Sequence, residues 1–396
     1  MTNAQLVEKG KKYIMNTYGR LPIALVRGKG CYVYDADDKE YLDFVAGIAV
    51  NALGHCHPVV IEAIQKQVEN LIHCSNLYWI EPQIDLAQLL IENSCMDKAF
   101  FCNSGAEANE GAIKLSRKYA KEQANPQKFE IISMQNSFHG RTLATLTATG
   151  QKKLQKNFDP LPQGFCYADF NDLESVKSKI TESTCAILVE PVQGEGGVVV
   201  ADPQFLAGLR QLCDRHDLLL IFDEVQVGMC RTGKLFAYEH SGVQPDVITL
   251  AKALAGGAPI GALLARGKAA ETFAPGDHAS TFGGNPLVTS AGVATLSYML
   301  EQDLAGHVAK MSAYMQEKMR ALMKKHAFIK EVRGQGLLLG LLLEKEGAPI
   351  VASCLTKGLL INCTAGTVLR FVPPLVVTEK EIDKAIAILD ESLAEE

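Results

Sequence analysis

The order of apolar runs along the sequence predicts an α/β protein with a mostly parallel central sheet and a smaller α+β domain. Five apolar or β-branched runs end in small or acidic residues, at residues 99–102, 130–133, 185–190, 218–223 and 246–250. Helical patterns fill gaps between these runs, for example at residues 106–122 and 203–216. This alternation is typical of a sheet covered on both faces, and ligands bind such sheets beyond the carboxyl ends of the strands.

A change of pattern near residue 291 predicts the start of the smaller domain. Four methionines recur there every four residues, namely Met311, Met315, Met319 and Met323. This spacing indicates a long helix with a buried methionine face. Short strands are expected next, at residues 336–343, 359–362 and 368–372. A capping box at residues 378–381 then predicts the start of a final helix.

We therefore expect three parts: an N-terminal segment (1–50), a large ligand-binding domain (51–290) and a C-terminal small domain (291–396). The N-terminal segment contains strand patterns near residues 30–34 and 41–44. It is too short to fold alone, so we expect it to pack with the small domain.

The composition excludes several classes of protein. The 39 basic and 45 acidic residues give a net charge of −6, which argues against binding to nucleic acid or to an anionic membrane. The lysine-containing N-terminus (1–20) lacks the apolar run of a secretory signal, so we expect a cytoplasmic protein. The most apolar stretch (247–265) contains Lys252, Pro259 and three glycines, which does not suit a membrane span.

The cysteines and histidines predict neither disulfides nor a metal site. Eleven cysteines occur without any C-x-x-C pair, which is typical of reduced thiols. His55, Cys56 and His57 resemble metal ligands, but adjacent side chains point in different directions and no second ligand cluster is evident. A turn before Pro58 is the favoured interpretation.

Lys252 lies among small and apolar residues, in the segment Ile248–Gly257. Burial disfavours a charged ammonium, so it lowers the pKa of a lysine and produces a nucleophilic amine that can form an imine. Taken alone, Lys252 is better explained as a lysine at a helix end whose charged group reaches solvent, or as one paired with a carboxylate.

Asp223 changes this interpretation, because it ends the predicted strand twenty-nine residues before Lys252, at the ligand-binding edge. Pyridoxal phosphate needs a lysine for its aldehyde and a carboxylate that keeps its pyridine nitrogen protonated. Lys252 and Asp223 together supply both groups. The alternative for Asp223 is a helix N-cap, which leaves the neighbouring Glu224 unexplained.

Three loops that follow predicted strands add further candidates. Ser104 and Gly105 lie between a strand and a helix, where free backbone N–H groups suit a phosphate, although simple capping explains them too. Phe138 could stack on a flat cofactor and Arg141 could bind a carboxylate, unless this is an ordinary surface loop. Glu195 lies in a glycine-rich segment that could also be a flexible turn.

These residues together resemble the class-III aminotransferases, which are fold-type-I enzymes dependent on pyridoxal phosphate. The resemblance covers nearly the whole chain, and its motifs lie at residues 17–20, 53–58, 138–150 and 368–375. The motif at residues 138–150, FHGRTLATLTATG, is specific to the family. The resemblance places the cofactor in the large domain.

The resemblance implies a cofactor role for nine residues. Lys252 forms the imine and Asp223 pairs with the pyridine nitrogen, while Gln226 lies near the ring hydroxyl. Phe138 and Val225 enclose the ring. Four residues hold the phosphate, namely Ser104, Gly105, Ala106 and Thr281. Because Thr281 comes from the neighbouring subunit in this family, a homodimer is implied.

The resemblance also implies how substrates bind, and it is strongest to the members that act on N-acetylornithine in arginine biosynthesis. Arg141 would bind the α-carboxylate of N-acetylornithine or the distal carboxylate of 2-oxoglutarate. Arg370 would bind the α-carboxylate of the oxo acid, and Glu195 would pair with Arg370 when the donor is bound. Tyr18 matches a substrate-side tyrosine, although it could simply be packing.

Several alternatives remain at this point. Enzymes for ornithine, succinylornithine, succinyldiaminopimelate and 4-aminobutyrate share the pattern. Ornithine enzymes have a tyrosine where this chain has Gly47 and Ile48, which favours an acylated donor here. A non-catalytic binding module, an aminomutase or a decarboxylase would not need the lysine, both arginines and Glu195 together. Cys230 stands where relatives commonly have glycine, and it is expected to be either an apolar filler or a reactive thiol.

Overall fold

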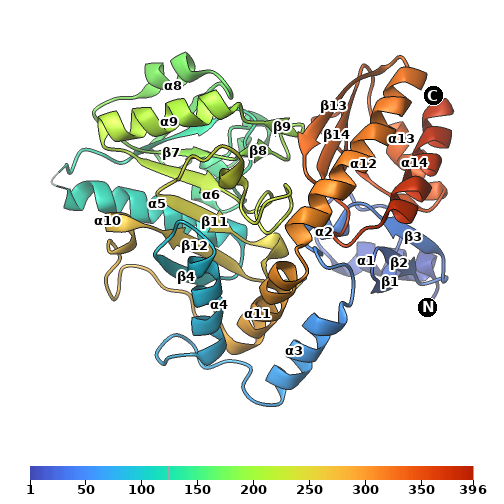
Figure 1. Cartoon of the computed structure of the whole chain (residues 1–396), viewed down its shortest axis with the longest axis horizontal. Helices are drawn as coiled ribbons and strands as arrows, with labels where there is room; N and C mark the ends of the chain where they lie inside the picture. Colours follow the sequence, from blue (N-terminus) through green and yellow to red (C-terminus); the bar gives the residue numbers. More distant parts are fainter. Residues whose placement is uncertain (124, 396) are drawn as a thin grey trace.

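A seven-stranded sheet forms the centre of the larger domain in this computed structural model, which describes residues 1–123 and 125–395 (Figure 1). The spatial order of its strands is β4 (Lys98–Cys102), β12 (Gly261–Ala265), β11 (Val247–Leu250), β10 (Leu219–Asp223), β7 (Thr184–Val189), β5 (Glu130–Met134) and β6 (Phe165–Ala168). Only β12 runs antiparallel to its neighbours. The predicted mostly parallel sheet is confirmed, and β6 and β12 are strands that the sequence did not predict.

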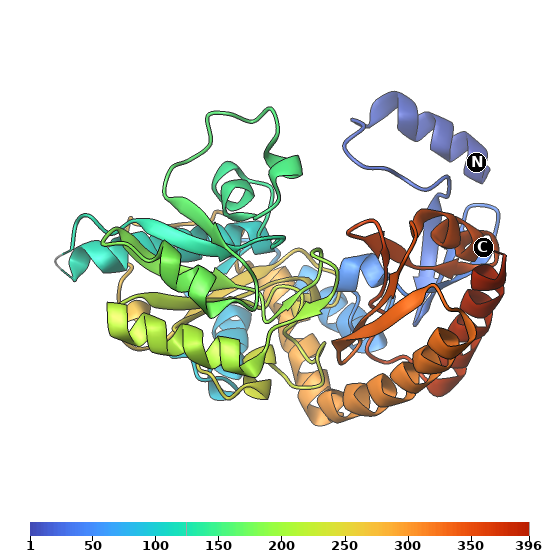
Figure 2. The same ribbon diagram turned by 90° about the horizontal axis from the view of Figure 1, so that it is seen from above.

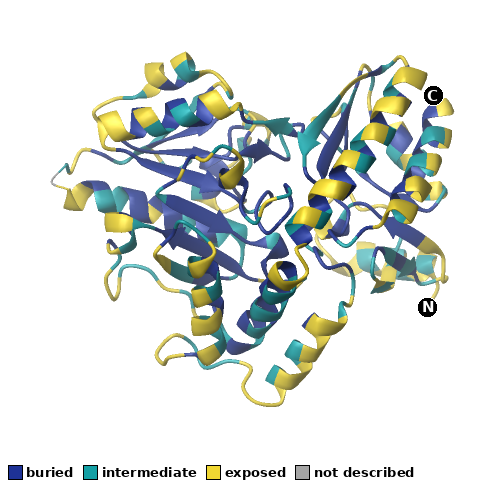
Figure 3. Ribbon diagram, viewed as in Figure 1, coloured by how far each residue is buried: buried dark blue, intermediate teal, exposed yellow. Residues whose placement is uncertain are grey.

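The sheet is buried on both faces, and its side chains alternate between two apolar clusters (Figure 3). In β10, Leu220 and Phe222 belong to the cluster that contains α9 (Pro203–His216). Leu219 and Ile221 belong instead to the cluster that contains α5 (Gly105–Glu122). This period of two explains why the central strands appear in the sequence as continuous apolar runs.

Long helices lead from the larger domain to the smaller one. Helix α11 (Pro286–Glu301) packs against α3 (Pro58–Val68) and α4 (Glu81–Glu92), and α12 (Leu304–Lys325) follows after a short break. Met311, Met315 and Met319 of the predicted methionine face are buried. Met323 is partly buried against the same core. The predicted boundary at residue 290 falls inside α11 and remains a prediction.

The smaller domain contains an antiparallel sheet and two further helices. Its strands are, in spatial order, β13 (Ile329–Gln335), β14 (Leu338–Leu343), β17 (Val368–Phe371) and β16 (Asn362–Thr364). Helices α13 (Ala348–Thr356) and α14 (Glu379–Ala394) pack together beside it. The capping box is confirmed, because the Thr378 backbone N–H donates to Glu381 Oε2 at 2.8 Å.

The N-terminal segment is joined to the C-terminal part of the chain. Strands β1 (Leu25–Lys29), β2 (Tyr32–Asp35) and β3 (Glu40–Asp43) form an antiparallel sheet, and β15 (Leu359–Leu360) extends it in parallel beside β3. Figure 2 shows α1 (Asn3–Tyr13) beyond this sheet, connected through a long loop. Each helix in the described parts of the chain is too short or too polar to cross a bilayer.

The remaining elements are short segments that connect the main strands and helices. They are α2 (Ala46–Ala49), α6 (Leu143–Ala148), α7 (Lys152–Gln155), α8 (Leu173–Lys179), β8 (Val192–Gln193), β9 (Val199–Val200), η1 (Ala237–His240), η2 (Lys252–Ala255) and α10 (Gly267–Ala270).

Candidate active site

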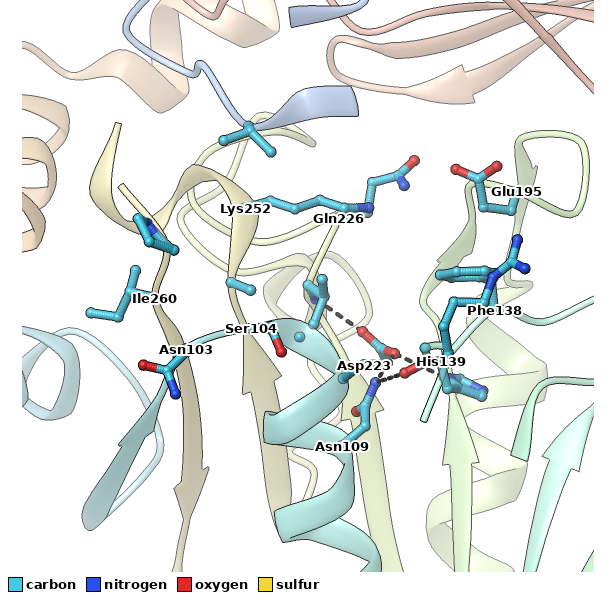
Figure 4. Close-up of a pocket in the computed structure, with 18 of the residues that line it drawn as sticks. Asn103, Ser104, Asn109, Phe138, His139, Glu195, Asp223, Gln226, Lys252 and Ile260 are labelled. Carbon is cyan, nitrogen blue, oxygen red and sulfur yellow. Dashed lines mark hydrogen bonds and ion pairs between the residues drawn. The ribbon is translucent and has the colours of Figure 1, made fainter. Parts of the chain in front are cut away.

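A pocket of about 380 Å³ lies where the strands β4, β5, β7, β10 and β11 end (Figure 4). Most of the predicted site residues line it, namely Ser104, Gly105, Ala106, Phe138, Arg141, Glu195, Asp223, Val225, Gln226 and Lys252. Segments that are far apart in the sequence meet here because parallel strands present their carboxyl ends at one edge of the sheet.

Asp223 ends β10 and is held by three hydrogen bonds. Its Oδ2 accepts from Asn109 Nδ2 and His139 Nδ1, both at 2.8 Å, and its Oδ1 accepts from the Val225 backbone N–H at 3.0 Å. Figure 4 shows the first two contacts as dashed lines. Because Asp223 is 4% exposed, these groups replace water around the carboxyl. They fix the direction in which Asp223 faces the pocket.

Asn109 and His139 are functional residues that the sequence reasoning missed. Asn109 lies on the buried face of α5, and its Oδ1 accepts from Thr249 Oγ1 of β11 at 2.8 Å. Its Nδ2 also donates to the His139 backbone carbonyl at 2.8 Å. The available signal was an asparagine among the small and apolar residues of a helix, where a polar side chain needs a partner.

Lys252 follows β11 in the short turn η2, with its backbone in the left-handed region at φ 42°. This conformation is uncommon for a residue with a side chain and is typical of functional sites. Burial lowers the pKa of its amine from 10.5 to about 8, although the nearby Glu195 carboxylate favours the charged form. About a tenth of the amine is therefore uncharged at pH 7, far more than for an ordinary lysine, and this fraction is nucleophilic.

The N-terminus of α5 forms an anion-binding cradle beside Val225. Ser104 is the N-cap, and its Oγ accepts from the Glu107 backbone N–H at 3.2 Å. A Cβ on Gly105 would lie 2.7 Å from Val225 Cγ1, so only glycine permits this close approach. The unpaired N–H groups of the first turn and the helix dipole both favour a phosphate here.

Phe138 and Val225 line the same pocket and come from different strand ends. The Phe138 backbone N–H donates to Glu190 Oε2 at 3.0 Å, and the Arg141 guanidinium lies 5.4 Å from the Phe138 ring centroid. Burial, together with the neighbouring Asp223, raises the pKa of Glu190 well above its ordinary value. Glu190 was not assigned a role from the sequence, and its buried carboxyl supports the Phe138 loop through this hydrogen bond.

Arg370, which is 1% exposed, forms an ion pair with Glu195 at the side of the pocket. Arg370 Nη1 lies 2.5 Å from Glu195 Oε1 and also donates to Gln226 Oε1 at 3.3 Å. Its Nε donates to Asn362 Oδ1 at 3.2 Å. Burial opposes ionisation of Glu195, but Arg370 outweighs it, so the pKa of Glu195 is lowered. The sequence-predicted pair is thus in contact.

Two predicted site residues lie outside this pocket in the single chain. Tyr18 is exposed and lines a separate hollow beside α1. Thr281 is exposed and lines another hollow, together with His278 and Phe282. The roles of both residues remain predictions.

Three residues that the sequence left open have structural roles. Glu224 accepts from the backbone N–H groups of Ala237 and Tyr238, at 2.6 and 2.8 Å, and so holds the turn after β10. Cys230 is buried in the main core, and burial raises its pKa to about 12, so it is an apolar filler. His55 pairs with Asp43 at 2.8 Å, and the described residues contain no group of three potential metal ligands.

The buried amine of Lys252 gives a prediction about its reactivity with pH. The rate at which it forms an imine with a small aldehyde should rise up to about pH 8 and then level off, because its pKa is about 8. An ordinary lysine of pKa 10.5 would continue to gain reactivity above pH 10. Reductive trapping followed by peptide mass spectrometry measures the rate, with Lys252→Arg as the control. A continued rise past pH 10 would contradict the prediction.

Comparisons with known proteins identify the family of this chain. The family model "Aminotransferase class-III" matches residues 13–393. An acetylornithine aminotransferase from Caldanaerobacter subterraneus subsp. tengcongensis is 55% identical, over 97% of this chain and 98% of the relative.

Two solved structures are also similar. An ornithine aminotransferase from Toxoplasma gondii with partial occupancy of PLP at its active site has a TM-score of 0.96 and 34% identity, covering 100% of this chain and 94% of that one. An N-acetylornithine aminotransferase from Stenotrophomonas maltophilia has a TM-score of 0.85 and 37% identity, covering 98% of both chains. The chain therefore belongs to the class-III aminotransferase family, as its sequence motifs predicted.

Proposed function

We propose that this enzyme transfers the δ-amino group of N2-acetyl-L-ornithine to 2-oxoglutarate, in arginine biosynthesis. The products are N-acetyl-L-glutamate 5-semialdehyde and L-glutamate. The observation that carries the proposal is the buried Glu195–Arg370 pair in contact with the pocket of Lys252. The similarity to acetylornithine aminotransferases over nearly the full chain supports the choice of donor.

Pyridoxal phosphate fits the groups that the pocket presents. The α5 cradle at Ser104 and Gly105 suits its phosphate, and Asp223 suits its ring nitrogen. Phe138 and Val225 would hold the flat ring between them. When bound, this cofactor supplies an aldehyde for the amino group and a protonated ring that accepts the electron pair of a broken C–H bond.

Lys252 and Asp223 are the two residues of the chain that would act directly on the reacting groups. Lys252 Nζ, once free, would remove the proton from the donor carbon that bears the reacting amino group and would later return a proton to the bound group. Its pKa of about 8 suits both roles near neutral pH. Asp223, held by Asn109 and His139, would keep the ring nitrogen of the bound cofactor protonated.

The two arginines explain how one pocket accepts two different substrates. Arg141 would bind the α-carboxylate of the donor, whose reacting end is an uncharged chain. Glu195 neutralises Arg370 while this donor is bound, since an unpaired buried guanidinium would be costly. The carboxylate of 2-oxoglutarate then replaces Glu195 through a two-pronged contact with Arg370.

We also propose a cytoplasmic homodimer. All eleven cysteines are free, which is typical of a reducing compartment. Large apolar side chains are strongly exposed near Thr281, namely Leu77, Tyr78, Trp79 and Phe282. Asn76 Nδ2 donates to the Ser280 carbonyl at 2.9 Å, which places these two segments side by side. A second copy of the chain would cover this surface and receive Thr281 in its cofactor site.

A spectroscopic titration tests the proposed reaction. The purified protein, loaded with pyridoxal phosphate, should show a visible absorbance band that N-acetylornithine removes and 2-oxoglutarate restores. Product analysis should find N-acetyl-L-glutamate 5-semialdehyde after the addition of N-acetylornithine, and glutamate after the addition of 2-oxoglutarate. If only ornithine or 4-aminobutyrate removed the band, the donor would be wrong but the reaction class would stand. If pyridoxal phosphate produced no band, the cofactor assignment would fail.

Glu195→Gln should impair one half-reaction more than the other. The kcat/KM for N-acetylornithine should fall by about tenfold or more, because Arg370 then faces the uncharged donor without a carboxylate partner. The kcat/KM for 2-oxoglutarate should change little, since its own carboxylate pairs with Arg370. Single-turnover absorbance changes measure each half separately. The exposed Glu182→Gln is the matched control, and equal losses in both halves would refute this role for Glu195.

The dimer gives a prediction for Thr281. Thr281→Ala should weaken the binding of pyridoxal phosphate without dissociating the dimer, as measured by cofactor titration and sedimentation. Thr356→Ala, which is exposed in the smaller domain, is the matched control. Trp79, the single tryptophan, should emit at shorter wavelength in the dimer than in a diluted monomer, because assembly buries it. A monomer that binds the cofactor fully would contradict both the dimer and the shared site.

A further inference from the structure

Arg231 is completely buried, although the reaction proposed above makes no use of it. It lies five residues after Gln226, in a turn whose preceding residues Met229 and Cys230 have left-handed φ values of 54° and 68°. This turn continues the segment that carries Asp223 and Gln226 into the pocket. Arg231 is thus connected directly to the active site through its own backbone.

The side chain of Arg231 crosses to the smaller domain and binds two backbone carbonyls there. Its Nη1 donates to the Leu337 carbonyl at 3.0 Å and to the Pro373 carbonyl at 2.7 Å. Its own carbonyl accepts from the Leu337 backbone N–H at 2.9 Å. A Cβ on Gly336 would lie 2.3 Å from the Arg231 carbonyl oxygen, so glycine is required for this close contact.

These carbonyls belong to the two strands that position Arg370. Leu337 immediately precedes β14, and Pro373 lies three residues after Arg370, just beyond β17. In the sheet, Gly340 of β14 is paired with Arg370 of β17. Arg231 therefore holds the start of one strand and the end of the other. Gln226, earlier in the same segment, contacts the Arg370 guanidinium itself.

A role in stability alone explains Arg231 poorly. Its Nε and Nη2 have no hydrogen-bond partner among residues 1–123 and 125–395, and no carboxylate in that part of the chain forms an ion pair with it. Burial accordingly lowers its pKa to about 9. Apolar side chains that replace a buried charge are often neutral or stabilising, so what this arginine supplies is the pair of carbonyl contacts made by its Nη1.

We propose that Arg231 is a positioning residue for the oxo-acid half-reaction, a proposal that rests on the proposed function. By holding the carbonyls of Leu337 and Pro373, it sets the distance between the Arg370 guanidinium and the reacting end of the pocket. The donor half-reaction depends on Arg141 for its carboxylate and on Glu195 to neutralise Arg370, so it needs this ion pair and not a direct contact between Arg370 and the substrate. Arg231 thus contributes to the recognition of 2-oxoglutarate without touching it.

Arg231→Met and Arg231→Lys test this proposal in the cofactor-loaded enzyme. Methionine fills a similar volume without donors, whereas lysine retains the charge and can reach one carbonyl. We expect Arg231→Met to reduce kcat/KM for 2-oxoglutarate by about 10- to 100-fold, through KM, with the donor half-reaction changed by less than about threefold. Arg231→Lys should lie between Arg231→Met and the unchanged enzyme. Arg210→Met, which removes an arginine on α9 outside the pocket, should leave both half-reactions similar.

A second readout does not depend on turnover. Glutarate, a five-carbon dicarboxylate without a reactive carbonyl, should bind Arg231→Met about tenfold or more weakly in a spectral titration. Equal losses in both half-reactions, or unchanged glutarate affinity in a folded variant, would overturn the proposal. If Arg231→Met did not fold, the same comparison in Arg231→Lys would decide. If the unsubstituted enzyme did not react with N-acetylornithine but did bind glutarate, the proposed donor would be wrong. The glutarate affinities of the Arg231 variants would still test the role of Arg231.

Discussion

A sheet that is buried on both faces can present charged groups to a ligand only where its strands end, and this constraint determines where the chemistry lies. In β10 every residue is buried, and Asp223 is the last of them. The neighbouring β11 is equally buried and leads directly to Lys252. Because these strands are parallel, the carboxylate and the amine arrive at the same edge. The order of apolar runs therefore predicts the position of the active site together with the fold.

The second consequence of burial is that each charge in the pocket needs a partner from another element. Asp223 of β10 is held by Asn109 of α5 and by His139 of the loop after β5. Glu195 is paired with Arg370 of β17, across the two domains. Among residues 1–123 and 125–395 no group forms a hydrogen bond or ion pair with the Lys252 amine, and burial lowers its pKa. The pocket thus stabilises its fixed charges and leaves the reacting amine free.

The sequence predicted the residues whose chemistry follows from position along the chain, and it missed those whose role follows from distance in space. Lys252 and Asp223 stand at the ends of apolar runs, which are visible in one dimension. Asn109 and His139 lie 114 and 84 residues from Asp223, so their contacts appear only in the folded chain. Strand β12 was hidden for a related reason, because the apolar stretch 247–265 contains β11, a short turn and β12, and Lys252 is its only charged residue. Tyr18 and Thr281 are both exposed in the single chain, so the fold of one chain does not bring them to the pocket.

The position of Arg370 links substrate choice to the relation between the two domains. Arg370 belongs to the smaller domain, whereas Glu195, Gln226 and Lys252 belong to the larger one. A shift of one domain would therefore change the Glu195–Arg370 contact before it changed the surroundings of Lys252 and Asp223. Recognition of the oxo acid is thus more sensitive to domain placement than the proton transfer is. This difference gives a physical reason for Arg231, which binds carbonyls across the domain boundary although its burial costs desolvation energy.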